Sequence, residues 1–174
     1  MREIFQSSNI SVVVDNNILI DLFELRRLDL LFKVFVNVVI PEKIYNEEVS
    51  QDIIECLQQH TYILGNFLTE RGLNTLSILM NDDKFKRLSD NDKYAIAFAS
   101  ENYYFCNSND KPVRNACEAL NIKHTGTLGV LGRAYYQSLL TKDELFSLLD
   151  QLISDSTTCY ISLKMVEQFK LEIL

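Results

Sequence analysis

The sequence has no run of about 18 consecutive apolar residues, the length that a membrane-spanning helix needs. Its first ten residues, MREIFQSSNI, also lack the apolar segment of a secretory signal. We therefore expect a cytoplasmic protein with no membrane partner. The four cysteines lie far apart without a C-x-x-C pair, and each has apolar neighbours, which favours reduced core thiols over disulfides or a zinc site.

Prolines and basic residues are also few. With only two prolines and 47% hydrophobic residues, the 174-residue chain can close one core, so residues 1–174 are expected to form a single domain. The 17 basic residues against 24 acidic ones give a formal net charge of −7, which argues against a broad basic surface for nucleic acid. A nucleic-acid enzyme is still compatible, because a divalent cation in an acidic pocket supplies local positive charge.

Segments typical of strands alternate with segments typical of helices. β-branched or apolar runs predict strands at 10–14, 35–40, 61–65, 103–106 and 121–126. Helical spacing of apolar residues predicts helices at 17–33, 42–59, 69–80, 91–102, 112–120, 127–140, 141–154 and 160–174. This alternation implies an α/β fold, a three-layer α/β/α sandwich around a central parallel sheet. Ligands of such folds bind at the carboxyl ends of the strands.

Four acidic residues fall where they can face this edge of the sheet. Asp15 ends the first strand, Glu47 lies in the helix after the second, Asp92 begins a later helix, and Asp110 follows the strand at 103–106. Carboxylates that lie close together repel one another unless some are protonated or a cation lies between them. Mg²⁺ or Mn²⁺ is the natural partner of such oxygen ligands.

Each acid also has a simpler explanation when it is taken alone. Asp15 and Asp110 could cap the helices that follow them, and Asp92 could interact with a helix dipole. Glu47 could lie on a solvated helix face. The metal-site hypothesis therefore depends on the joint order of the four acids along one α/β domain.

These residues resemble the motifs of the PIN-domain nucleases, in particular the bacterial single-domain proteins that include toxins of toxin–antitoxin pairs. VVVDNN is similar to the first motif, in which the Asp is followed at the second position by Asn or Ser, here Asn17. IPEKIYNEEV resembles the second motif, where an acid follows Pro by six residues, which selects Glu47 over Glu48.

The later motifs continue the resemblance. LSDNDKYAIAFASE is similar to the third motif and selects Asp92 over Asp90, and FCNSNDKPVRNAC is similar to the fourth, giving Ser108, Asn109 and Asp110. HTGTLGVLGRA and YISLKMVEQF resemble the end of one bacterial branch, so the likeness covers about residues 10–170. The family often has Gly-Glu where this chain has Asn91-Asp92, an exchange that shortens the ligand side chain by one methylene. The neighbouring acids Asp90 and Glu48 remain alternative ligands.

The resemblance implies a hydrolase, a Mg²⁺- or Mn²⁺-dependent endoribonuclease. Asp15, Asp92 and Asp110 would hold one or two ions, and Glu47 would bind a second ion or orient the water. Asn17, Ser108 and Asn109 would support ligands or the RNA phosphate. It also implies a cognate antitoxin protein and a homodimer, for which the apolar helix at 127–140 is one candidate surface.

Other interpretations and contacts remain open. A non-catalytic PIN-like binding module is one alternative, and an α/β phosphatase with a strand-end aspartate is another, although such sites usually need a second Asp where this chain has Asn17. Five basic residues could contact the RNA backbone or simply be solvated: Lys93, Lys111, Arg114, Lys123 and Arg133. His124 is expected to be a structural histidine.

Overall fold

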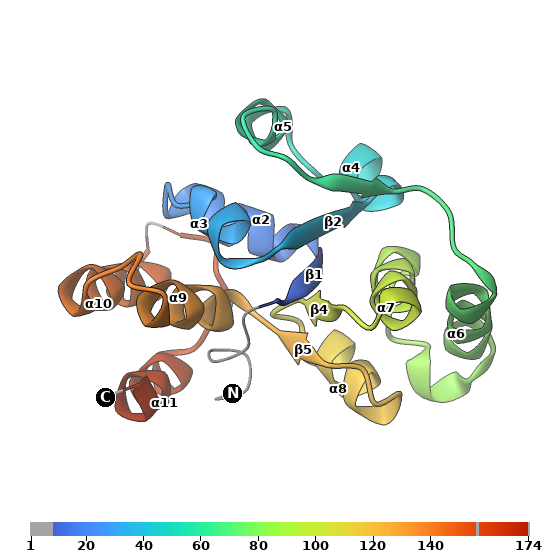
Figure 1. The fold of residues 1–174 in the computed structure, drawn as a ribbon. Helices are drawn as coiled ribbons and strands as arrows, with labels where there is room; N and C mark the ends of the chain where they lie inside the picture. Colours follow the sequence, from blue (N-terminus) through green and yellow to red (C-terminus); the bar gives the residue numbers. More distant parts are fainter. Residues whose placement is uncertain (1–8, 156, 174) are drawn as a thin grey trace.

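The computed structural model describes residues 9–155 and 157–173, which form a five-stranded parallel sheet between layers of helices (Figure 1). The strand order is β3-β2-β1-β4-β5. The strands are β1 (Ser11–Val14), β2 (Asn37–Pro41), β3 (Ile63–Gly65), β4 (Phe105–Asn107) and β5 (His124–Thr125). All strand pairs are parallel. The central strand β1 is built from valines that are fully buried, as expected for a strand covered on both faces.

The helices cover both faces of the sheet. Helices α7 (Asp90–Asn102) and α8 (Lys111–Ala119) lie on one face, and α6 (Glu70–Asn81) packs outside α7 (Figure 1). On the other face lie α2 (Asn16–Glu24), α3 (Asp29–Val34) and α9 (Thr127–Tyr136), with α10 (Lys142–Leu152) and α11 (Leu163–Ile173) beyond α9. The expected three-layer α/β/α sandwich is therefore confirmed.

The strand order reverses between β1 and β4. From β1 the chain builds β2 and β3 on one side of the sheet, and it then crosses to build β4 and β5 on the other side. The ends of β1 and β4 are paired directly, since Val14 is in register with Asn107. In open α/β sheets such a switch point leaves a crevice at the carboxyl ends of the strands. Asp15 and the segment 108–110 both emerge there.

Two of the expected helices are each divided in two. The helix expected at 17–33 ends at Glu24 and resumes as α3, because Arg26 has a φ of 55°, which a right-handed helix cannot contain. The helix expected at 42–59 is divided into α4 (Glu42–Glu47) and α5 (Gln51–Leu57). Ser50 begins α5 by accepting a hydrogen bond from the backbone N–H of Ile53. The other expected elements are present with shifted ends.

Helix α9 bears on two of the expectations. Its residues from Thr127 to Ala134 are buried and belong to the core, so the exposed apolar side chains of the candidate dimer surface at 127–140 are Tyr136 and Leu139. Arg133 is also fully buried, where its Nε donates to the carbonyl oxygen of Val34. An RNA contact by Arg133 was therefore a wrong prediction, because the guanidinium joins α9 to the end of α3.

The four thiols are free, but only Cys106 and Cys117 are fully buried; Cys56 and Cys159 are partly exposed. Core burial was therefore predicted correctly for two of the four. Among the described helices, each is too short or too polar to cross a bilayer.

Candidate metal centre

Three aspartates meet at the point where the strand order reverses. Asp15 follows β1, Asp92 lies in the first turn of α7, and Asp110 precedes α8. One carboxylate oxygen from each lies within 4.8 Å of the others. The structure thus brings together three of the four acids that the sequence suggested.

Asp15 is the most buried of the three, with 6% of its surface exposed. Its Oδ1 accepts the backbone N–H of Asn16 at 2.8 Å and so caps α2. Its Oδ2 accepts hydrogen bonds at 2.6 Å from the Ser108 hydroxyl and from the Asn17 amide. Helix capping and membership of the acidic cluster are therefore compatible, because each carboxylate oxygen has its own partners.

The environment of Asp15 favours its neutral form. Burial, together with the charges of Asp92 and Asp110, raises its pKa from 3.8 to about 7, against the lowering effect of the Ser108 hydrogen bond. A cation beside the carboxylate would reverse this balance. The observed cluster is therefore suited to a bound divalent cation.

Asp92 is fixed by the start of its own helix. The Ser89 hydroxyl accepts the backbone N–H of Asp92 at 3.1 Å, and Asp92 Oδ2 accepts the backbone N–H of Ser89 at 2.7 Å. This capping box orients the carboxylate at the N-terminal end of α7. Asp90 instead lies 3.6 Å from Lys93 and is 66% exposed. The geometry thus brings Asp92, and not Asp90, into the cluster.

Asp110 begins α8, yet its carboxylate makes no capping hydrogen bond to that helix. Burial and the charge of Asp92 raise its pKa, whereas Asn17 and Arg114 lower it. Its backbone N–H donates to the Ser108 hydroxyl at 3.2 Å. Ser108 therefore connects Asp15 to Asp110, whose carboxylate does not cap α8 and lies in the cluster with the other two aspartates.

Glu47 lies beside the three aspartates but does not join them. Its carboxylate accepts hydrogen bonds from Lys43 at 2.6 Å and from Asn91 at 3.2 Å, and these bonds lower its pKa. The Asn91 amide also donates to Glu48. Because Asn91 precedes Asp92 directly, the Glu47–Glu48 pair flanks the cluster through this one amide.

A second set of polar residues, which the sequence analysis missed, holds the segment 108–110 in place through hydrogen bonds. The buried carboxylate of Asp21 accepts hydrogen bonds at 2.6 Å from Asn109 and from Thr127. The backbone N–H of Asn109 donates to Asn17 Oδ1 at 3.1 Å. Burial raises the pKa of Asp21. The sequence did contain a signal, since Asp21 lies four residues after Asn17 and so on the same face of α2.

The protein is a parallel α/β domain, and its three clustered aspartates lie at the carboxyl ends of β1 and β4, where the strand order reverses. The chain belongs to the PIN-domain family, because the model of that family matches residues 11–173. A search of curated proteins gives no match to this chain. Membership supports a nuclease fold, and the three aspartates form a group that could hold a divalent metal.

Proposed function

We propose that this protein is a metal-dependent endoribonuclease that hydrolyses RNA phosphodiester bonds. The main support is that three aspartates from separate parts of the fold each place a carboxylate oxygen within 4.8 Å of the others. The chain also belongs to the PIN-domain family. The donor set fits Mg²⁺ or Mn²⁺, since hard cations take oxygen ligands.

Asp15, Asp92 and Asp110 would hold the ion, which when bound activates water and stabilises negative charge on the phosphate. Asn17 and Ser108 keep the Asp15 carboxylate in place through hydrogen bonds of 2.6 Å each. These partners orient the ligand, as is usual for residues that contact metal ligands.

Further roles follow from the positions of neighbouring groups. Glu47 would bind a second ion or orient the attacking water from the rim of the cluster. Asn109 would hold the segment between Ser108 and Asp110 through its bonds to Asp21 and Thr127.

The test is cleavage of single-stranded RNA, tRNA and single-stranded DNA by the purified protein, with Mn²⁺ or with EDTA. Asp15→Asn and Asp92→Asn should each abolish RNA cleavage, and EDTA should do the same to the parent. Asp90→Asn is the matched control and should retain activity, because Asp90 lies outside the cluster. Cleavage retained in both cluster variants would contradict the proposal.

The same preparation distinguishes the alternatives. Phosphate release from small phosphomonoesters without RNA cleavage would favour a phosphatase. This outcome is not expected, because position 17 offers an amide that donates to Asp15 rather than a second carboxylate. A protein with no cleavage and no thermal shift at millimolar Mn²⁺ would instead be a binding module.

A toxin role is part of the proposal and is supported by the family resemblance. A small antitoxin encoded beside this chain would then cover the acidic crevice with an arginine side chain. Overexpression of the parent should arrest growth, and overexpression of Asp15→Asn should not. Growth that is unaffected by the parent, with the folded protein present, would contradict this role.

A further inference from the structure

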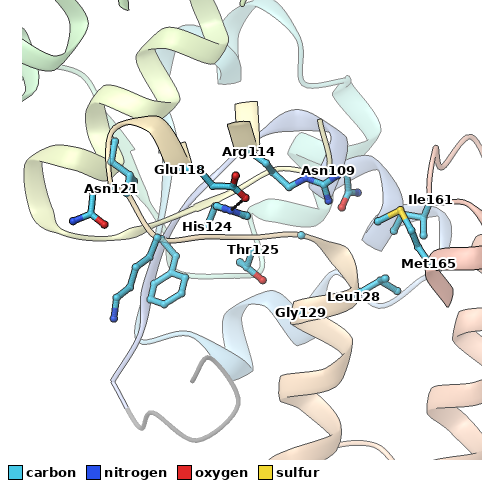
Figure 2. Close-up of a pocket in the computed structure, with 14 residues that line it drawn as sticks. Asn109, Arg114, Glu118, Asn121, His124, Thr125, Leu128, Gly129, Ile161 and Met165 are labelled. Carbon is cyan, nitrogen blue, oxygen red and sulfur yellow. Dashed lines mark hydrogen bonds and ion pairs between the residues drawn. The ribbon is translucent and has the colours of Figure 1, made fainter. Parts of the chain in front are cut away.

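A cavity of about 550 Å³ opens at the β5 edge of the sheet, beside the metal centre (Figure 2). It is enclosed by α8, by the loop that leads into β5, and by the start of α9 and α11. Its size falls within the usual range for small-molecule sites, roughly 300 to 1,000 Å³. None of the roles proposed above for the three aspartates uses this cavity.

Two residues connect the cavity to the metal centre. Asn109 lines the cavity and lies between Ser108 and Asp110 in the chain. Arg114 also lines it and lies one helical turn after Asp110, whose backbone carbonyl oxygen accepts the backbone N–H of Arg114 at 3.0 Å. Figure 2 shows Arg114 and Asn109 along the same rim. A strand of nucleic acid with its phosphate at the aspartates would therefore pass Arg114 as it enters the cavity.

The charge of the cavity differs from that of the whole chain. The protein has a formal net charge of −7, yet the lining carries Arg114 and Lys123 against one carboxylate, Glu118. That carboxylate is engaged by His124, whose Nε2 lies 3.3 Å from Glu118 Oε1 (Figure 2). Lys123 extends over the ring of Phe105, with 5.6 Å between Nζ and the ring centroid. Two cationic side chains in the lining suit a phosphate-bearing ligand.

The rest of the lining suits a nucleobase. Apolar side chains provide a surface for the face of a base, and they come from Phe105, Leu128, Ile161 and Met165. The amide of Asn121 offers both donors and acceptors to its edge. Single-stranded RNA is recognised by this combination, because its unstacked bases present both a flat face and a hydrogen-bonding edge.

We propose that this cavity holds the nucleotide next to the cleaved phosphodiester of a single-stranded nucleic acid. Arg114 contacts the phosphate between the two sites, Lys123 contacts the phosphate on the far side of the base, and the base occupies the apolar part of the cavity. Which nucleotide of the substrate occupies the cavity, relative to the bond cleaved at the aspartates, rests on the proposed nuclease function. It adds a binding site outside the metal centre.

The test is an NMR titration of the metal-free protein in EDTA with uridine and adenosine 5′-monophosphates, which requires neither metal nor cleavage. Amide shifts should be largest from Asn121 to Gly126. The double variant Arg114→Gln/Lys123→Gln should weaken binding by about tenfold or more, as expected for the loss of charge-assisted contacts. The matched control is Lys86→Gln/Arg87→Gln, which removes the same two charges outside this cavity and should leave the affinity within about twofold of the parent value.

A second measurement tests whether the nucleotide in the cavity is the one next to the cleaved bond. An RNA that carries one abasic nucleotide beside its cleavage site should be cut more slowly by the parent, and the double variant should lose this discrimination between abasic and normal RNA. Equal cleavage of both substrates by the parent would overturn the assignment.

The outcomes separate this proposal from the nuclease function. Nucleotide binding in the cavity without RNA cleavage would contradict the nuclease function while supporting the nucleotide site. Cleavage without shifts in the cavity, or equal weakening by the control variant, would overturn the nucleotide site. A cavity that binds only a peptide of a co-expressed partner, and no nucleotide, would also overturn it.

Discussion

The amide of Asn109 joins the metal centre to a buried carboxylate, with 2.6 Å between Asn109 Nδ2 and Asp21 Oδ2. Asn109 stands between Ser108 and Asp110, so this bond fixes the segment that carries one aspartate and supports another. Thr127 strengthens the link, because its hydroxyl donates to Asp21 and its backbone N–H donates to Asn109 Oδ1 at 3.0 Å. The position of the aspartate cluster therefore depends on the hydrogen bonds among Asn109, Asp21 and Thr127.

The first prediction concerns this network. Asp21→Asn replaces an oxygen that accepts from Asn109 and Thr127 with a group that can itself donate, so these contacts should be disrupted. We expect Mn²⁺ affinity and RNA cleavage to fall by about 10- to 100-fold, the usual range for residues that support metal ligands. Isothermal titration with Mn²⁺ and a cleavage assay measure the two effects.

A control separates positioning from general destabilisation. Ser100 is also buried, and its hydroxyl shares a hydrogen bond of 2.8 Å with Thr75; it lies about two turns along α7 from Asp92. Ser100→Ala should lower the free energy of unfolding by about 1 kcal/mol and leave Mn²⁺ affinity unchanged. Equal losses of affinity in the two variants would mean that Asp21 acts only through stability.

The second prediction is that the metal-free protein becomes less stable as the pH rises from 5 to 8. The folded state holds a proton on Asp15 up to a pKa of about 7, whereas the unfolded carboxyl releases it near 3.8. The folded state therefore binds more protons in this window, and the free energy of unfolding must fall with rising pH. The loss from Asp15 is up to roughly 3 kcal/mol and ends above the folded pKa.

Urea unfolding in EDTA at a series of pH values measures this slope. Asp15→Asn should flatten it, although Asp21 and Asp110 add to it in the same direction because their pKa values are also raised. Asp90→Asn should leave the slope unchanged, since Asp90 is exposed. A parent protein whose stability rises from pH 5 to pH 8 would show that the Asp15 carboxyl is ionised in the folded state.

The sequence predicted the sheet well because strand signals are local. The valines before Asp15 and the β-branched run before Pro41 each mark a buried strand, and the strict alternation with helices leaves few topologies. The placement of Asp15, Asp92 and Asp110 followed, because the ends of parallel strands and the starts of the next helices share one edge.

The rest depended on contacts between distant segments. Whether Glu47 reaches the centre is decided by Lys43 and Asn91, which hold its carboxylate at the rim. The burial of Arg133 results from the packing of α9 against α3, to which no local pattern points. The role of Asp21 depends on Asn109 and Thr127, which lie 88 and 106 residues away in the chain.

The third prediction tests which acid of α7 binds the metal. Asp92→Asn should weaken Mn²⁺ binding by at least about tenfold, because one oxygen of the cluster is replaced by a neutral amide. Asp90→Asn should change it by less than about twofold, since Asp90 faces Lys93 at the surface. The thermal shift induced by Mn²⁺ compares both variants with the parent, and the reverse order of effects would assign Asp90 as the ligand.

The fourth prediction concerns the pair Glu47 and Glu48, which share the amide of Asn91. Glu47 is also held by Lys43, so its carboxylate is not free to join the three aspartates without breaking that ion pair. We therefore expect Glu47→Gln to leave Mn²⁺ affinity within about threefold of the parent value, as for an exposed group. The cleavage rate should nevertheless fall by about tenfold or more, if Glu47 orients water or binds a second ion.

The matched variant Glu48→Gln identifies which glutamate acts. It should leave both Mn²⁺ affinity and cleavage rate near the parent values, and Lys43→Met should raise Mn²⁺ affinity by releasing the Glu47 carboxylate toward the cluster. Single-turnover cleavage at saturating Mn²⁺ separates the rate from metal binding. A rate that falls in Glu48→Gln but not in Glu47→Gln would transfer the role to Glu48, whose carboxylate is bound by Asn91 in the same way.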